Sequence, residues 1–211
     1  MQAVAVSGSR RVLSRDTSGL LTAHLLPQYE FPGRGLVEFR SMASSPRRRS
    51  KSLPGHLPEA APGEVLVWTD GACQRNPGPG GWAALLCWED GIVEEHSGGL
   101  ALTTNNIMEM TAALEGLRAL PSGSRVCVVT DSRYLHDGMT SWMAGWKRKG
   151  WKTASGDPVK NKEIWVALDA AASDHEHVRW HWVKGHIGHA HNERADVLAV
   201  AATQTAARSG R

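Results

Sequence analysis

Two stretches decide the fold: VLVWTD at residues 65–70 and VCVVTD at residues 126–131. Each begins with a continuous apolar run, which is typical of a central strand buried on both faces. Each ends in Thr-Asp. Ligand sites of open α/β sheets lie outside the carboxyl ends of parallel strands. If the two strands are neighbours, we therefore expect Asp70 and Asp131 to lie close together at one edge of the sheet.

The surrounding sequence predicts a mixed sheet with helices on its faces. An Asn-Pro-Gly-Pro-Gly-Gly segment at residues 76–81 is expected to be a loop, and a Glu-Asp-Gly turn at 89–91 indicates an antiparallel hairpin. Five strands are expected at residues 65–68, 82–88, 92–100, 126–129 and 178–183, and helical segments at 105–120, within 132–173 and at 192–207. The predicted order is β-β-β-α-β-α-α-α-β-α.

The 211 residues allow one domain and an extension. Residues 1–63 hold nine Lys and Arg against four Asp and Glu, lack sustained periodicity and are expected to be a mostly disordered basic leader. Alternatives are a transit-type peptide or a true translation start at Met42. Residues 64–207 form the expected domain, and 208–211 a tail. The domain and tail hold fifteen basic and seventeen acidic residues, so bulk charge does not indicate nucleic acid binding.

Cysteine and apolar patterning exclude several classes of protein. Cys73, Cys87 and Cys127 form no CxxC pair, which argues against a disulfide scaffold and a Cys-built zinc site. This usage fits a reduced compartment, and we expect a cytoplasmic protein. No run of ~18 uncharged apolar residues predicts a membrane span. Nothing in the sequence suggests more than a monomer.

Four acidic residues are candidate metal ligands. Asp70 and Asp131 would repel each other at one sheet edge, and a divalent cation bound by hard oxygen ligands, Mg²⁺ or Mn²⁺, would remove that penalty. Glu109 lies early in a predicted helix but off its apolar stripe, and Asp196 lies early in the last helix. Each has an alternative interpretation. The aspartates can cap the next turn, Glu109 has capping-box spacing with Asn106, and Asp196 can be a favourable helix-start charge.

A basic segment interleaved with tryptophan lies at residues 142–162, where six Lys and Arg face a single acid, Asp157. This pattern suits the backbone of a nucleic acid duplex, with phosphates paired to basic side chains. The alternative is a solvated helix whose tryptophans pack inward. We expect both, with Trp146 more buried and Lys147, Lys149 and Lys152 facing substrate.

Five sequence blocks, taken together and in order, resemble type 1 ribonuclease H, in particular the bacterial form with a basic protrusion. The blocks are WTDGAC at 68–73 with NPGPGGW at 76–82, TTNNIME at 103–109, TDSRY at 130–134, WVKGHIGH at 182–189 and NERAD at 192–196. The resemblance covers residues 64 to about 205. It implies a ribonuclease H-like five-stranded sheet whose first three strands form an antiparallel meander.

The resemblance also implies an activity and a site. It implies an endoribonuclease that cuts the RNA strand of an RNA–DNA hybrid irrespective of sequence, leaving 5′-phosphate and 3′-hydroxyl ends. Two Mg²⁺ ions, with Mn²⁺ as a possible substitute, would be held by Asp70, Glu109, Asp131 and Asp196, and His186 would assist catalysis. The resemblance implies hybrid contacts from Cys73, Asn76, Thr104, Asn105, Asn106, Trp142, Trp146, Lys147, Lys149, Trp151 and Lys152.

Two other functions compete with this one. A related sheet nuclease, such as an integrase or resolvase, would act on DNA, but the match through Asn105-Asn106 and Lys184-Gly185-His186 argues against it. A fold that binds hybrids without cutting them is the non-enzymatic alternative. Acidic residues at all four expected positions argue against that alternative.

Overall fold

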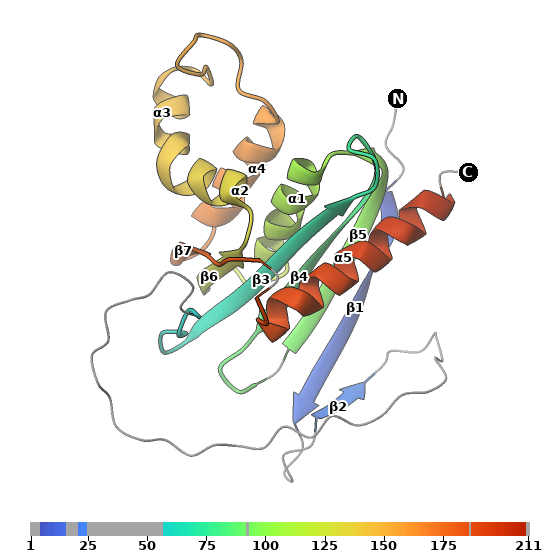
Figure 1. Ribbon diagram of the computed structural model, residues 1–211. Coiled ribbons are helices and arrows are strands. Elements are labelled where there is room, and N and C mark those ends of the chain that lie inside the picture. Colours follow the sequence, from blue (N-terminus) through green and yellow to red (C-terminus); the bar gives the residue numbers. More distant parts are fainter. Residues whose placement is uncertain (1–4, 16–20, 25–56, 92, 186, 210–211) are drawn as a thin grey trace.

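The computed structural model describes residues 5–15, 21–24, 57–91, 93–185 and 187–209. Its strands form one sheet of order β2-β1-β5-β4-β3-β6-β7 (Figure 1). The strands are β1 (Ala5–Arg15), β2 (Leu21–His24), β3 (Glu64–Cys73), β4 (Gly78–Cys87), β5 (Val93–Thr103), β6 (Arg125–Thr130) and β7 (His177–Trp182). The helices are α1 (Asn105–Arg118), α2 (Arg133–Asp137), the π-helical turn η1 (Gly138–Trp142), α3 (Met143–Arg148), α4 (Lys162–Ser173) and α5 (Ala190–Ser209).

The two Thr-Asp strands lie side by side in the sheet. β3 and β6 are parallel, and their register pairs Thr69 with Thr130. Asp70 and Asp131, which directly follow these two threonines, therefore lie at the same edge of the sheet. β3, β4 and β5 pair antiparallel as a meander, and β7 adds parallel to β6. The predicted five-stranded mixed sheet is confirmed as β5-β4-β3-β6-β7.

Two further strands extend this sheet. β1 pairs antiparallel with β5, from Ala5 opposite Leu100 to Leu13 opposite Val93, and β2 pairs with β1. Both lie in residues 1–63, and the prediction that this leader is mostly disordered did not anticipate them. The backbone of β5 would otherwise be an open sheet edge, which explains how a segment without strong periodicity can add there. Most of the remaining leader lies outside the described residues.

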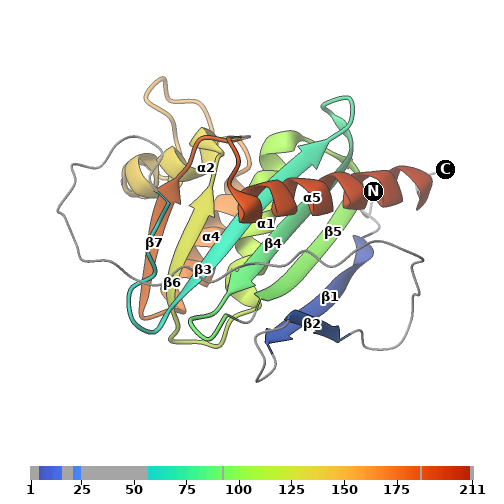
Figure 2. The ribbon, with the colours of Figure 1, turned by 60° about the horizontal axis from the view of Figure 1, so that its bottom comes forward.

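Helices cover both faces of the sheet. α1 and α4 pack on one face, and α5 runs across the other (Figure 2). One core, which includes Val67, Leu86 and Trp165, lies under α1 and α4. A second, smaller core, which includes Trp68 and Leu85, lies under α5. Among the described residues, no helix combines the length and apolarity needed to cross a membrane.

The Gly/Pro segment is only partly a loop. β4 begins at Gly78, so the prediction of a loop through residue 81 was wrong. The glycines serve close packing: a Cβ on Gly81 would lie 2.3 Å from the carbonyl oxygen of Ala199 and 2.4 Å from the amide nitrogen of Thr203. The backbone of α5 therefore lies directly against β4, which the turn-like composition concealed.

We predict that Gly81→Ala destabilises the protein by about 1–3 kcal/mol or more, because the added methyl group would push α5 from the sheet. Urea unfolding would measure the loss. Gly145→Ala is the matched control, since a Cβ on Gly145 would meet no atom within 4 Å and alanine favours the helix by up to about 1 kcal/mol. Equal stabilities for the two variants would contradict the packing interpretation.

Candidate active site

Three of the four predicted carboxylates lie together beside the end of β6, where β3, which was expected to end at Thr69-Asp70, continues to Cys73. Asp70 is in β3, Glu109 is in the second turn of α1, and Asp131 directly follows β6. One carboxylate oxygen from each residue lies within 4.8 Å of those of the other two. Asp70 and Glu109 are buried, and Asp131 is half-buried. The parallel register of β3 and β6 explains why Asp70 and Asp131 lie close together, as the sequence led us to expect if the two strands were neighbours.

Burial and like charge oppose ionisation at this cluster. Burial, followed by the charge of Asp131, raises the pKa of Asp70 to about 7. Burial and then the charges of Asp70 and Asp131 raise the pKa of Glu109 well above its ordinary range. These raised pKa values follow from holding three acids close together and largely out of water.

The cluster is compatible with a divalent cation. Glu109 Oε2 is buried without a hydrogen-bond partner, so this atom is available as a ligand. All the donor atoms are carboxylate oxygens, which hard ions such as Mg²⁺ and Mn²⁺ prefer. A bound cation would also remove the repulsion that raises the pKa of these groups.

Close packing of α1 against β3 brings Glu109 to Asp70. A Cβ on Gly71 would lie 2.3 Å from the amide nitrogen of Glu109, so only glycine permits this approach. The helix is capped by Thr104, whose Oγ1 accepts a hydrogen bond from the amide of Ile107 (3.4 Å). The alternative of a capping box between Asn106 and Glu109 is therefore wrong. Glu109 instead accepts a hydrogen bond from Asn105 Nδ2 (3.4 Å).

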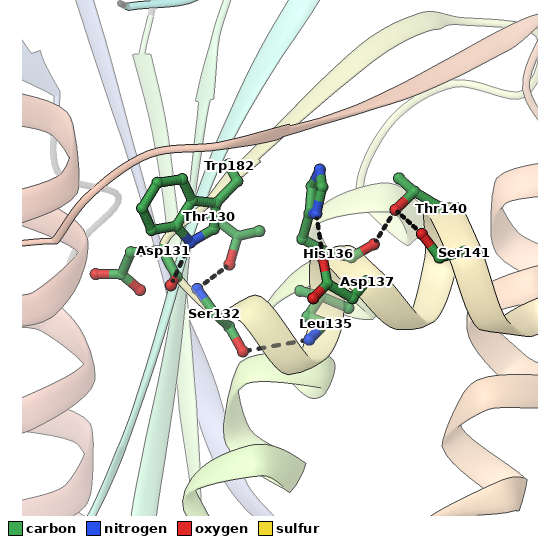
Figure 3. A network of polar contacts seen from close by, with 9 residues as sticks. All are labelled: Thr130, Asp131, Ser132, Leu135, His136, Asp137, Thr140, Ser141 and Trp182. Carbon is green, nitrogen blue, oxygen red and sulfur yellow. Dashed lines mark hydrogen bonds and ion pairs between the residues drawn. The ribbon is translucent and has the colours of Figure 1, made fainter. Parts of the chain in front are cut away.

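Asp131 is held by contacts from β7, which Figure 3 shows, and from α5. The Trp182 indole donates a hydrogen bond to the Asp131 carbonyl oxygen (2.9 Å). Asn192 Nδ2 donates to the Asp131 carboxylate (3.2 Å), and Gly185 lies so close that a Cβ there would approach Asp131 Oδ2 to 2.3 Å. Asn192 was not among the candidate site residues. Its position four residues before Asp196 on a helix, and thus on the same face, was the signal available.

Asp196 lies near the cluster but is not one of the three acids with mutually close oxygens. It is half-buried in α5, and its charge contributes to the raised pKa of Asp70. Its side chain therefore acts on the same edge of the sheet. His186, the predicted catalytic histidine, lies outside the described residues.

The residues outside the basic segment for which the resemblance implies hybrid contacts lie near the acids. The Asn76 side chain accepts a hydrogen bond from the amide of Asn105 (3.3 Å), which joins the loop after β3 to the start of α1. Cys73 Sγ donates to the carbonyl oxygen of Thr103 (3.5 Å), and burial raises its pKa. Thr104 caps α1, and Asn106 is exposed. The structure thus brings together these five residues, although it leaves their contacts with nucleic acid a prediction.

The basic segment forms α3 and the loop after it, beside the tryptophans that support it. Trp146 packs between Trp142 and Trp165, at ring-centroid distances of 5.5 and 5.4 Å. Trp146 and Trp151 are half-buried against the main core, whereas Trp142 is 38% exposed. The inward-packing alternative therefore accounts for part of the pattern, and Trp146 is more buried than Trp142, as expected.

The lysines of the basic segment are not equivalent. Lys147, Lys149 and Lys152 are all exposed. Lys147 Nζ, however, forms an ion pair with Asp169 Oδ2 of α4 (2.7 Å). The sequence offered only Asp157 as a partner for the basic residues and gave no sign of Asp169, because α3 and α4 meet only in the fold. Lys149 and Lys152 form no ion pair with another residue in the described part of the chain.

The chain is similar in sequence and in fold to known proteins. The family model for RNase H matches residues 62–204. The ribonuclease H of Dinoroseobacter shibae is 56% identical over 140 residues, which cover 64% of this chain and 88% of that protein. The crystal structure of LC9-RNase H1, described as a type 1 RNase H with the type 2 active-site motif, has a TM-score of 0.61 and 34% identity, covering 74% of this chain and 75% of that one. LC11-RNase H1 shares the fold at 22% identity and a TM-score of 0.51, covering 67% of this chain and 98% of that one.

The architecture is the ribonuclease H-like fold, with an acidic cluster at the end of its central strands. The chain belongs to the ribonuclease H family. The resemblance to type 1 ribonuclease H that the sequence blocks indicated is thereby confirmed.

We predict that Asp70→Asn stabilises the metal-free protein above pH 7. The raised pKa of Asp70 means that the folded state disfavours its charge. The wild type keeps the stability associated with the neutral acid below about pH 4 and loses it as the pH rises through about 7. The variant's advantage should therefore be absent near pH 4 and reach up to about 4 kcal/mol at pH 8, at ~1.4 kcal/mol per pKa unit.

Chemical unfolding in a chelator at both pH values would measure this difference. Addition of Mg²⁺ should then stabilise the wild type more than the variant. A variant that is less stable than the wild type at pH 8 without metal would refute the electrostatic account.

Proposed function

We propose that this protein is a divalent-metal-dependent endoribonuclease that hydrolyses the RNA strand of RNA–DNA hybrids. The observation that carries the proposal is the convergence of Asp70, Glu109 and Asp131 within 4.8 Å in a chain of the ribonuclease H family. The solved structure of LC11-RNase H1 is a complex with an RNA/DNA hybrid, which supports this class of substrate.

The four carboxylates would hold the metal. Asp70, Glu109 and Asp131 offer clustered oxygens, and Asp196 would complete the set from α5. Two bound Mg²⁺ ions would activate the attacking water and stabilise the leaving 3′ oxygen, giving 5′-phosphate and 3′-hydroxyl ends. Trp182 and Asn192 hold Asp131 in place, and Gly71 brings Glu109 to Asp70. A catalytic contribution from His186 stays a prediction.

The residues beside the acids would select and hold the duplex. Asn76 and Asn105 are neutral hydrogen-bonding groups near the metal cluster, so they can recognise the 2′-hydroxyl of RNA without adding charge. Thr104 and Asn106 would contact the DNA strand. The exposed lysines of α3 and its following loop would pair with phosphates at a distance from the cut. We propose that the protein acts as a cytoplasmic monomer.

We predict that Asp131→Asn lowers the cleavage rate by more than the ~10–100-fold typical for loss of a residue that only supports a metal ligand. Hybrid binding should persist, because the basic segment is unchanged. An end-labelled hybrid would be assayed with Mg²⁺ beside RNA–RNA and DNA–DNA duplexes.

Asp137→Asn is the matched control, since Asp137 pairs with His136 (2.9 Å) away from the acid cluster. Near-wild-type turnover by Asp131→Asn would refute the metal-site assignment. Cleavage of the DNA duplex instead of the hybrid would favour the integrase or resolvase alternative, and hybrid binding by the wild type without cleavage would favour the non-enzymatic one.

We predict that Lys149→Ala and Lys152→Ala each reduce the salt dependence of hybrid binding by up to ~0.9 in the slope of log K against log salt concentration. Lys147→Ala should have a smaller effect, because its ammonium group is already paired with Asp169. Fluorescence anisotropy over a salt series would measure the slopes. Three unchanged slopes would show that the segment is a solvated surface that does not contact the hybrid.

A further inference from the structure

The start of α5 is attached to the sheet by two polar contacts on opposite sides of the helix. On one side, Asn192 Nδ2 donates to the Asp131 carboxylate (3.2 Å). On the other, the Arg194 guanidinium donates to both carboxylate oxygens of Glu95 in β5, at 2.7 and 2.9 Å. Asp196, which the proposed function makes a metal ligand, lies in the same part of the helix.

Helix geometry relates these contacts to Asp196. Ala195 is fully buried against the sheet, and each residue turns the helix by ~100°. Arg194 and Asp196 therefore project to opposite sides of the buried stripe. Asn192 lies four residues before Asp196 and shares its side. The contact between Arg194 and Glu95 of β5 consequently sets the rotation of α5 about its axis, and with it the direction in which Asp196 faces the acidic cluster.

The Glu95 carboxylate is buried, and its partner there is the Arg194 cation. Its side chain is 6% exposed, and it stands opposite Leu85 of β4. The nearby Cys87 thiol has its pKa raised to about 12, first by burial and then by the Glu95 charge. The hydrogen bond that Arg194 donates to Glu95 in turn raises the pKa of Arg194. A buried carboxylate without a partner is strongly unfavourable, so the pairing strongly constrains Arg194.

The remainder of α5 is held differently. From its middle onward α5 lies against glycines: a Cβ on Gly99 would lie 3.0 Å from Ala202 O and from Ala206 Cβ, and a Cβ on Gly81 would lie closer still, 2.3 Å from Ala199 O. The first half lies over the larger side chains of the second core, including Trp68 and Leu85. Such side chains permit more adjustment than a backbone contact does. The polar contacts therefore decide how the first turns sit.

We infer that the Arg194–Glu95 ion pair is a positioning device that fixes the rotation of the α5 start and thereby presents Asp196 to the metal cluster. The inference rests on the proposed function and adds two residues to that site, neither of which would touch substrate or metal. It makes metal affinity depend on a contact across the sheet, at β5.

The test measures Mg²⁺ binding to the nucleic-acid-free protein by calorimetry, using Glu95→Gln and Arg194→Met. Each variant should weaken Mg²⁺ binding about five- to tenfold. Cleavage should need correspondingly more Mg²⁺ for half-maximal rate, while the KM for hybrid at saturating Mg²⁺ stays unchanged. Arg194→Lys keeps the positive charge but has a single nitrogen in place of the two that contact Glu95. This variant should therefore recover part of the Mg²⁺ affinity.

Glu64→Gln is the matched control. The Glu64–Arg179 ion pair has the same 2.7 Å contact, and the Glu64 side chain is 2% exposed. Glu64 is the first residue of β3 and lies six residues before Asp70, at the end of the strand that is far from the acidic cluster. Its loss should lower the Tm as the Glu95 change does but leave Mg²⁺ affinity at the wild-type value.

The outcomes separate the inference from the function. Folded Glu95→Gln and Arg194→Met variants that bind Mg²⁺ within twofold of the wild type would overturn the inference, as would an equal loss of affinity in Glu64→Gln. If one variant fails to fold, the other and Arg194→Lys decide the result. A wild type that binds no Mg²⁺ or cleaves no hybrid would overturn the proposed function itself.

Discussion

Repulsion among buried carboxylates is the constraint on which the rest of this structure depends. Asp70, Glu109 and Asp131 approach within 4.8 Å, and burial together with like charge raises the pKa of Asp70 and Glu109. The site is costly to hold without a cation, so packing elsewhere must offset the cost. The same repulsion favours a divalent ion as soon as one is present.

Three kinds of contact hold the elements that carry Glu109, Asp131 and Asp196. Gly71 lets the α1 backbone approach β3 and brings Glu109 into place. Hydrogen bonds from Trp182 and Asn192 hold Asp131. On the opposite face, glycines and an ion pair hold α5. Backbone packing is the least adjustable of these contacts and fixes the distance between helix and sheet, whereas polar contacts adjust the direction of individual side chains.

Several expectations failed where local pattern and tertiary contact disagree. The glycines of residues 78–81 looked like a loop, but they lie in β4 because α5 needs room. The sequence indicated no partner for Lys147, but in the structure it forms an ion pair with Asp169 of α4. β1 pairs with the edge of β5 although its own sequence has weak periodicity. In each case the deciding partner is distant in sequence, so no local rule contains it.

The sequence by itself determined the five strands of the ribonuclease H-like sheet, the two Thr-Asp motifs, the candidate acids and the family, because periodicity and motif spacing are local properties of the chain. Only the tertiary structure decided which atoms meet. Asn192 contacts Asp131 across 61 residues, and Arg194 contacts Glu95 across 99. Such pairings depend on the rotation of α5 over the sheet, and that rotation follows from packing across both faces.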